Sequence, residues 1–140
     1  MRRAFAGLAT LQVLVLVTQF FLAASGAFDT APKDESFRMH AALGFAIVLI
    51  AVVTTVVAAV ARMPGRLVAM TGLVAGLAVL QPVLRAIAAV FDEAGGTTTA
   101  GELVFGLHAV NALAMLALSG TVARRSRQLA WPAASAQPAP

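Results

Sequence analysis

The chain contains four apolar runs, each long enough to cross a membrane as a helix, and no other feature limits its folding as strongly. These runs cover about 4–28, 38–61, 67–91 and 103–123. A helix needs about 20 apolar residues to span the hydrocarbon core of a bilayer. A segment in lipid must satisfy its own backbone hydrogen bonds, and the period-two alternation of a membrane barrel is absent. The sequence therefore predicts an all-α integral membrane protein, folded as an antiparallel four-helix bundle.

The composition supports a membrane protein and excludes several kinds of site. Hydrophobic residues make up 60% of the chain and charged residues 11%, whereas charged residues are about 25% of a soluble protein. There is no cysteine, which excludes disulfides, thiolate metal sites, iron–sulfur clusters and covalently attached c-type haem. The net charge is +4, but the basic residues lie where membrane topology places them. We therefore expect the lipid bilayer as a partner, and no nucleic acid.

The charged residues predict how the bundle is oriented. Seven arginines lie before the first run, between the second and third runs, and after the fourth run: Arg2, Arg3, Arg62, Arg66, Arg124, Arg125 and Arg127. The six acidic residues all lie in the two opposite loops: Asp29, Asp34, Glu35, Asp92, Glu93 and Glu102. The positive-inside rule then places both termini in the cytoplasm. We expect a transmembrane domain over 1–127 and a disordered, Pro/Ala-rich cytoplasmic tail over 128–140.

The two halves of the chain share one order of residues, which predicts two repeated helical hairpins. In the first half, Gln19, Leu22, Phe28-Asp29, Phe37 and His40-Ala41 follow one another. In the second half, the same order runs through Gln81, Leu84, Phe91-Asp92, Phe105 and His108-Ala109. Parallel repeats of this kind are related by an axis along the membrane normal. Such an axis would place His40 and His108 on opposite sides of one central cavity that opens outward.

The two histidines are the candidate metal ligands. An ionisable residue inside a membrane helix is costly and marks a functional site by default. Two neutral imidazoles can bind haem iron from opposite faces, each oriented by a hydrogen bond at its other ring nitrogen. A zinc or copper site would need a further ligand, and none is evident at this depth. The pattern favours a b-type haem held between His40 and His108.

Five further residues complete the candidate cofactor site. Gly44 and other small residues beside the histidines leave room for a flat porphyrin. Arg38 and Arg85 could meet anionic propionates with charge-assisted hydrogen bonds. Gln19 and Gln81 lie in the first and third runs, where they either contact the cofactor or join the helices to one another.

The leading hypothesis is a cytochrome-like protein for one-electron transfer or haem-dependent sensing near the outer face. Two histidine ligands leave iron no open position, which favours an electron carrier or binding protein over an enzyme. Its redox or membrane partner is unknown. Two alternatives stay open: a cofactor-free accessory or scaffold subunit whose polar residues join the helices, and a lipid- or quinone-binding membrane protein.

The segments 81–84 (Gln-Pro-Val-Leu) and 106–108 (Gly-Leu-His) resemble one half of the haem A synthase family. Each half of that family is a four-helix bundle, like those of b-type cytochromes, with histidines near the outer ends of its second and fourth helices. The resemblance implies haem ligation by His40 and His108. That family also has an acidic residue one turn before the first histidine and an arginine after it. Here these positions are Phe37 and Ala41, so oxidative haem modification is not implied.

The segments 37–44 and 106–112 also resemble an uncharacterised family of bacterial four-helix membrane proteins, and this is the closer of the two matches. It implies the topology and a bacterial-type plasma membrane, but no function.

Overall fold

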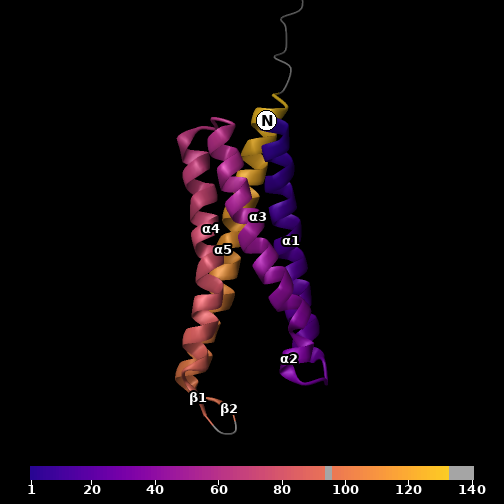
Figure 1. The fold of residues 1–140 in the computed structure, drawn as a ribbon, viewed down its shortest axis with the longest axis vertical. Helices are drawn as coiled ribbons and strands as arrows, with labels where there is room; N and C mark the ends of the chain where they lie inside the picture. The colour runs from indigo at the N-terminus through magenta and orange to yellow at the C-terminus, as the bar shows by residue number, and fades with distance from the viewer. Residues whose placement is uncertain (94–95, 133–140) are drawn as a thin grey trace, which may run out of the picture.

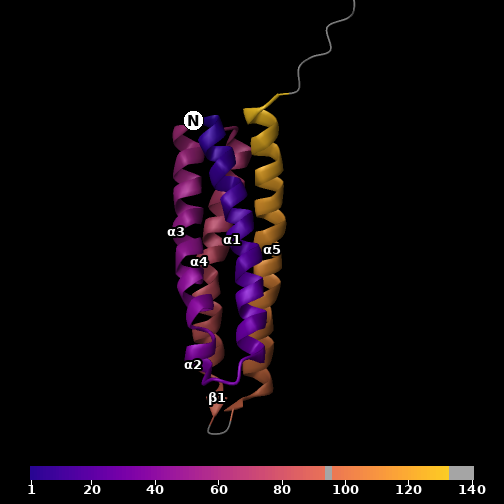
Figure 2. The ribbon, with the colours of Figure 1, turned by 90° about the vertical axis from the view of Figure 1, so that its right-hand side faces the viewer.

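A computed structural model of the chain describes residues 1–93 and 96–132. The elements in chain order are α1 (Arg2–Phe28), α2 (Lys33–Ser36), α3 (Arg38–Val60), α4 (Gly65–Ala89), β1 (Asp92–Glu93), β2 (Gly96–Thr97) and α5 (Thr99–Ala130). The four long helices run antiparallel and side by side along the long axis of the molecule (Figures 1 and 2). All four are long and apolar enough to cross a membrane. The prediction of an all-α four-helix bundle is confirmed.

The order of the helices around the bundle sets which residues can meet in its centre. Helix α1 packs mainly against α3 and α5, and α4 packs mainly against the same two helices. Consequently α3 and α5 face each other across one diagonal of the bundle, and α1 and α4 across the other.

The two ends of the bundle differ in shape and charge. At one end the α1–α3 arm, with α2, diverges from the α4–α5 arm, which carries β1 and β2 (Figure 1). We call this the histidine end, because His40 and His108 lie in the parts of α3 and α5 nearest to it. The other end, which we call the basic end, holds the start of α1, the α3–α4 turn and the last turns of α5.

The bundle interior is narrow, so most apolar side chains face outward. Buried apolar residues form one cluster near the basic end, including Phe5, Ala58 and Leu67, and a second around Leu16 and Met115. Only 17–28% of the residues in the apolar windows of the four helices are buried. A helix that is apolar all round needs an apolar surrounding, which the lipid of a membrane would supply.

Some helix boundaries differ from those of the apolar runs. Helix α5 extends over Thr99–Ala130, well beyond the run 103–123, because hydropathy marks only the apolar part of a helix. The Thr98 side chain caps its start by accepting a hydrogen bond from the Gly101 backbone N–H at 3.3 Å. The two outer loops contain α2 and a short β-hairpin in which Asp92 pairs with Thr97. Residues 128–130 of the predicted tail belong to α5, and 133–140 lie outside the described residues.

Candidate functional site

The structure brings the two histidines together from diagonal helices. His40 lies in the first turn of α3, and His108 lies in the third turn of α5. Their ring centroids are 6.3 Å apart, and the ring planes are inclined by 45°. Both side chains are half-buried. The two histidines of the predicted repeat therefore lie against each other.

Each imidazole is oriented by the backbone of the helix that precedes it in its own hairpin. The Nδ1 atom of His40 lies 3.2 Å from the carbonyl oxygen of Gln19, and Nδ1 of His108 lies 3.3 Å from the carbonyl oxygen of Gln81. A carbonyl can only accept, so each Nδ1–H is the donor and each Nε2 keeps its lone pair. The same contact occurs in both hairpins, which extends the sequence repeat to the geometry of the site.

The side chain of Gln19 adds contacts that Gln81 does not repeat. Its Nε2 donates to the His40 carbonyl oxygen at 2.9 Å and lies 3.3 Å from Nε2 of His40, whose lone pair accepts from the amide as long as no metal is bound. Gly44 lies beside this amide, since a Cβ at that position would stand 3.4 Å from the Gln19 Nε2, an ordinary van der Waals contact. The Oε1 atoms of Gln19 and Gln81 are buried, and neither has a hydrogen-bond partner within the described part of the chain.

Two phenylalanines contact the histidines, a role that sequence reasoning did not assign. The Phe105 ring stacks on His108 with centroids 5.3 Å apart and planes 9° apart. The Phe37 ring meets His40 edge-on at 6.0 Å. Each phenylalanine precedes its histidine by three residues, a spacing that puts two side chains on one helix face. The Phe-x-x-His spacing in both halves of the repeat was the sequence feature that could have indicated this contact.

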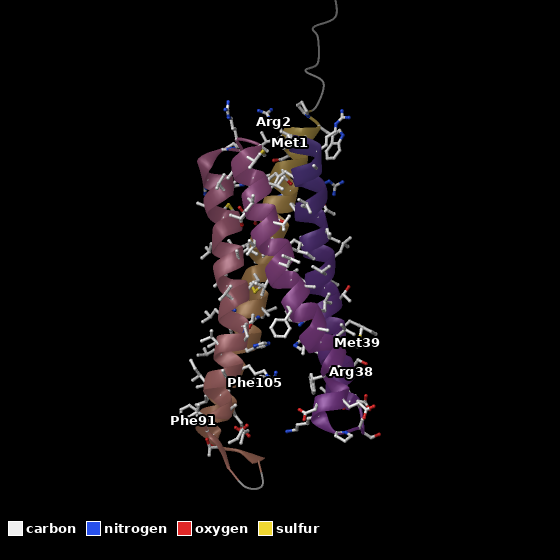
Figure 3. The ribbon with its side chains drawn as sticks, in the orientation of Figure 1. Met1, Arg2, Arg38, Met39, Phe91 and Phe105 are labelled. Carbon is white, nitrogen blue, oxygen red and sulfur yellow. The ribbon has the colours of Figure 1, made fainter. Side chains whose placement is uncertain are left out.

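The two candidate arginines lie at the histidine end with exposed side chains. Arg38 is the first residue of α3 (Figure 3), and Arg85 follows Gln81 by one turn of α4. Both are more exposed than the half-buried histidines. The structure thus joins His40, His108, Gln19, Gln81 and Gly44 in one cluster and leaves the two arginines at its accessible side.

A second polar cluster lies deeper in the bundle. Gln12, Thr54, Thr71 and Ser119, one from each long helix, are each only 2–3% exposed and line a cavity of about 10 Å³. Both amide atoms of Gln12 and the Ser119 hydroxyl have no hydrogen-bond partner among the described residues. None of these four residues was assigned to the candidate site from the sequence, because threonine and serine in an Ala- and Val-rich helix give no pattern that separates buried from lipid-facing positions.

Comparisons with known proteins give a family and no activity. Residues 19–94 match DUF6220, a family of unknown function. The match covers more than half of the chain and includes His40, Gln19, Gln81 and Arg85, and it ends before His108. No curated protein and no solved structure matches the chain.

Proposed function

Because the chain belongs to DUF6220, a family of unknown function, we propose from the site itself that it is a haem b-binding, cytochrome-like membrane protein. His40 and His108 would hold the haem iron. The observation that carries this proposal is the pairing of the two imidazoles across the bundle, each with its Nδ1 against a backbone carbonyl.

The spacing of the rings supports a shared metal ion. Imidazole nitrogen binds a transition metal at about 2 Å, which places two in-line ring centroids about 6 Å apart. The observed separation is 6.3 Å. The contacts at Nδ1 also fit, because a metal-binding histidine generally donates its other ring N–H to a carbonyl or carboxylate, and this orients the ring. A hydrogen bond alone would not require the two rings to approach each other.

The surroundings of the histidines suit an apolar, anionic cofactor. Apolar rings flank them, with Phe37 at His40 and Phe105 at His108. Small residues on the same helices, such as Gly44 and Ala109, limit crowding beside the ligands. Arg38 and Arg85 are exposed at the same end of the bundle, where a guanidinium can pair with a propionate carboxylate. The protein would thus bind and orient the group and keep its ligand nitrogens out of bulk water.

His40 and His108 would both ligate the haem iron, and a site with two histidine ligands would supply one-electron transfer rather than oxygen binding. We therefore propose electron transfer, or sensing that depends on haem, over an enzymatic reaction. Neither the sequence nor the site identifies the redox or membrane partner. Similarity to haem A synthase stays a prediction from the short segments 81–84 and 106–108.

We also propose that the basic end faces the cytoplasm of a bacterial-type plasma membrane, with the histidine end outside. Seven arginines flank the basic end, and all six acidic residues lie in or next to the loops of the histidine end. An excess of arginine and lysine marks the cytoplasmic side of membrane helices. The site would then exchange electrons near the outer face.

The test is an absorption spectrum of the protein purified in detergent, first air-oxidised and then reduced with dithionite. We expect a Soret band that shifts on reduction, with sharp α and β bands typical of low-spin haem. His40→Gly and His108→Gly should each abolish this spectrum, and added imidazole should restore part of it. Asn111→Leu is the matched control, because Asn111 lies one turn beyond His108 and contacts the Leu77 carbonyl instead. Its spectrum should be unchanged.

A cofactor-free scaffold is the second candidate, because the contacts His40–Gln19 and His108–Gln81 also join α1 to α3 and α4 to α5. In that case the protein would be colourless when made in cells with ample haem. His40→Gly would then lower only the thermal stability. A colourless wild-type protein would refute the haem proposal.

A further inference from the structure

A groove lies between α1 and α5 near the basic end, away from the histidines. These two helices lie side by side (Figure 2). The groove has a volume of about 340 Å³ and is lined by Thr10, Val13, Gly120, Ala123, Arg124 and Arg127. The four residues from α5 follow the spacing i, i+3, i+4 and i+7, so they form one face of that helix.

The groove is positively charged, and an anion that pairs with its arginines would come from outside the chain. Arg124 and Arg127 are exposed and lie one turn apart on the groove face. Arg125 faces elsewhere, since its Nη1 lies 3.9 Å from the Met70 sulfur on α4. Every aspartate and glutamate belongs to the histidine end. The nearest of these on α5, Glu102, precedes Arg124 by 22 residues, or about 33 Å of helix.

A helix of about 33 Å is long enough to place the arginines at the level of lipid phosphates. The hydrocarbon core of a bilayer is about 30 Å thick. With the start of α5 at one membrane surface, Arg124 therefore reaches the headgroup layer of the opposite surface. Basic pockets between membrane helices at this level bind anionic lipid headgroups.

The floor of the groove is apolar and open. It is formed by Val13, Ala123 and Gly120. The Thr10 hydroxyl already donates a hydrogen bond to the Ala6 carbonyl oxygen at 2.9 Å. A Cβ built on Gly120 meets no atom within 4 Å. An acyl chain could therefore lie along the floor while its phosphate contacts the arginines.

We propose that this groove binds one anionic phospholipid, with its phosphate at Arg124 and Arg127 and an acyl chain along Val13 and Gly120. Two other occupants fit the groove less well. A second copy packed by two-fold symmetry would bring the same arginines against each other. The chain's own segment 133–140 carries no acidic side chain that could pair with the arginines. The inference is independent of the haem proposal, because it uses none of the histidine-end residues.

The test is native mass spectrometry of the full chain, released from detergent that contains equal amounts of phosphatidylglycerol and phosphatidylcholine. We expect the wild type to retain phosphatidylglycerol in preference to phosphatidylcholine. The double variant Arg124→Gln/Arg127→Gln should retain it at least tenfold more weakly, since each arginine near a membrane surface contributes about fivefold. Gly120→Leu should also weaken retention, because its side chain fills the groove without changing the charge.

Matched controls separate the groove from general charge and bulk. Arg62→Gln/Arg66→Gln removes the same charge from the same end but lies outside the groove, so retention should match the wild type. Gly76→Leu adds the same bulk to α4, where a Cβ also meets no atom within 4 Å, and should have no effect. Equal retention of both lipids by the wild type would overturn the proposal. Equal losses of phosphatidylglycerol retention in the two double arginine variants would also overturn it. So would a dimer that excludes lipid and is abolished by Gly120→Leu.

Discussion

Gln12 and Asn111 both carry a carboxamide into the bundle interior, but their hydrogen bonding differs. Asn111 Nδ2 donates to the Leu77 carbonyl oxygen at 2.8 Å and so joins α5 to α4. Gln12 is 3% exposed, and neither of its amide atoms has a partner among the described residues. A buried polar group without a hydrogen bond costs about 1–3 kcal/mol. The two residues therefore contribute to stability with opposite signs.

We expect Gln12→Leu to stabilise the bundle by about 1 kcal/mol, because it removes an unpartnered amide and keeps a similar volume. Asn111→Leu should destabilise it by about 0.6 kcal/mol, the usual worth of one interhelical hydrogen bond in a membrane. Unfolding in detergent, followed by helical circular dichroism, measures both. A loss of stability in Gln12→Leu would contradict the prediction and would indicate a bound water that completes the amide's hydrogen bonds.

At the scale of the elements, one close contact sets how α1 leads into α3. Gly26 lies in the last turn of α1, against the Ser36 carbonyl and the Phe37 ring. A Cβ at Gly26 would stand 2.7 Å from the Ser36 oxygen and 3.2 Å from the ring. Because Phe37 also contacts His40, this packing positions the first histidine. Gly7 lies in the same helix, and a Cβ there would meet nothing within 4 Å.

We expect Gly26→Ala to destabilise the protein by about 1–3 kcal/mol, the usual cost of overpacking, and to weaken the proposed haem binding by displacing Phe37. Gly7→Ala should instead stabilise α1 by up to about 1 kcal/mol, because alanine favours a helix over glycine. Thermal unfolding and the reduced spectrum report the two effects. Similar behaviour of the two variants would show that the contact at Gly26 is unimportant.

Across the whole molecule, the separation of charge between the two ends determines how the bundle can sit in a membrane. The outward faces of the four long helices are apolar over lengths that match a bilayer. Arginines lie at one end, and the acidic residues lie at the other. Lipid would therefore surround the middle of the bundle, while the histidine pair lies close to one surface.

The absence of cysteine allows a direct test of this orientation with single cysteines at exposed positions. Thr30, in the loop after α1, and Gln128, near the end of α5, are both exposed. We expect Thr30→Cys to react with a membrane-impermeant maleimide in intact bacterial cells. Gln128→Cys should react only after the cells are permeabilised. The reverse pattern would place the histidine end in the cytoplasm and contradict the proposed outer site.

Hydropathy and residue spacing were enough to predict the number of long helices, their approximate bounds, the antiparallel bundle and the two histidines of the candidate site. These features depend on local composition and on spacing along one helix, which hydropathy and the repeat of Gln, Phe and His residues record directly. The sequence could not locate the ends of α5, because its polar last turns remain helical beyond the apolar run.

Which groups meet depends on how the four helices pack, and this is visible only in the structure. It placed α3 and α5 on one diagonal and brought the imidazole rings within 6.3 Å. It also gave each Nδ1 a backbone carbonyl, put Gly44 beside the Gln19 amide, and opened the groove between α1 and α5. These contacts join residues that are tens of positions apart. Their geometry depends on how four helices rotate and tilt against one another, and periodicity within a single helix carries no record of that.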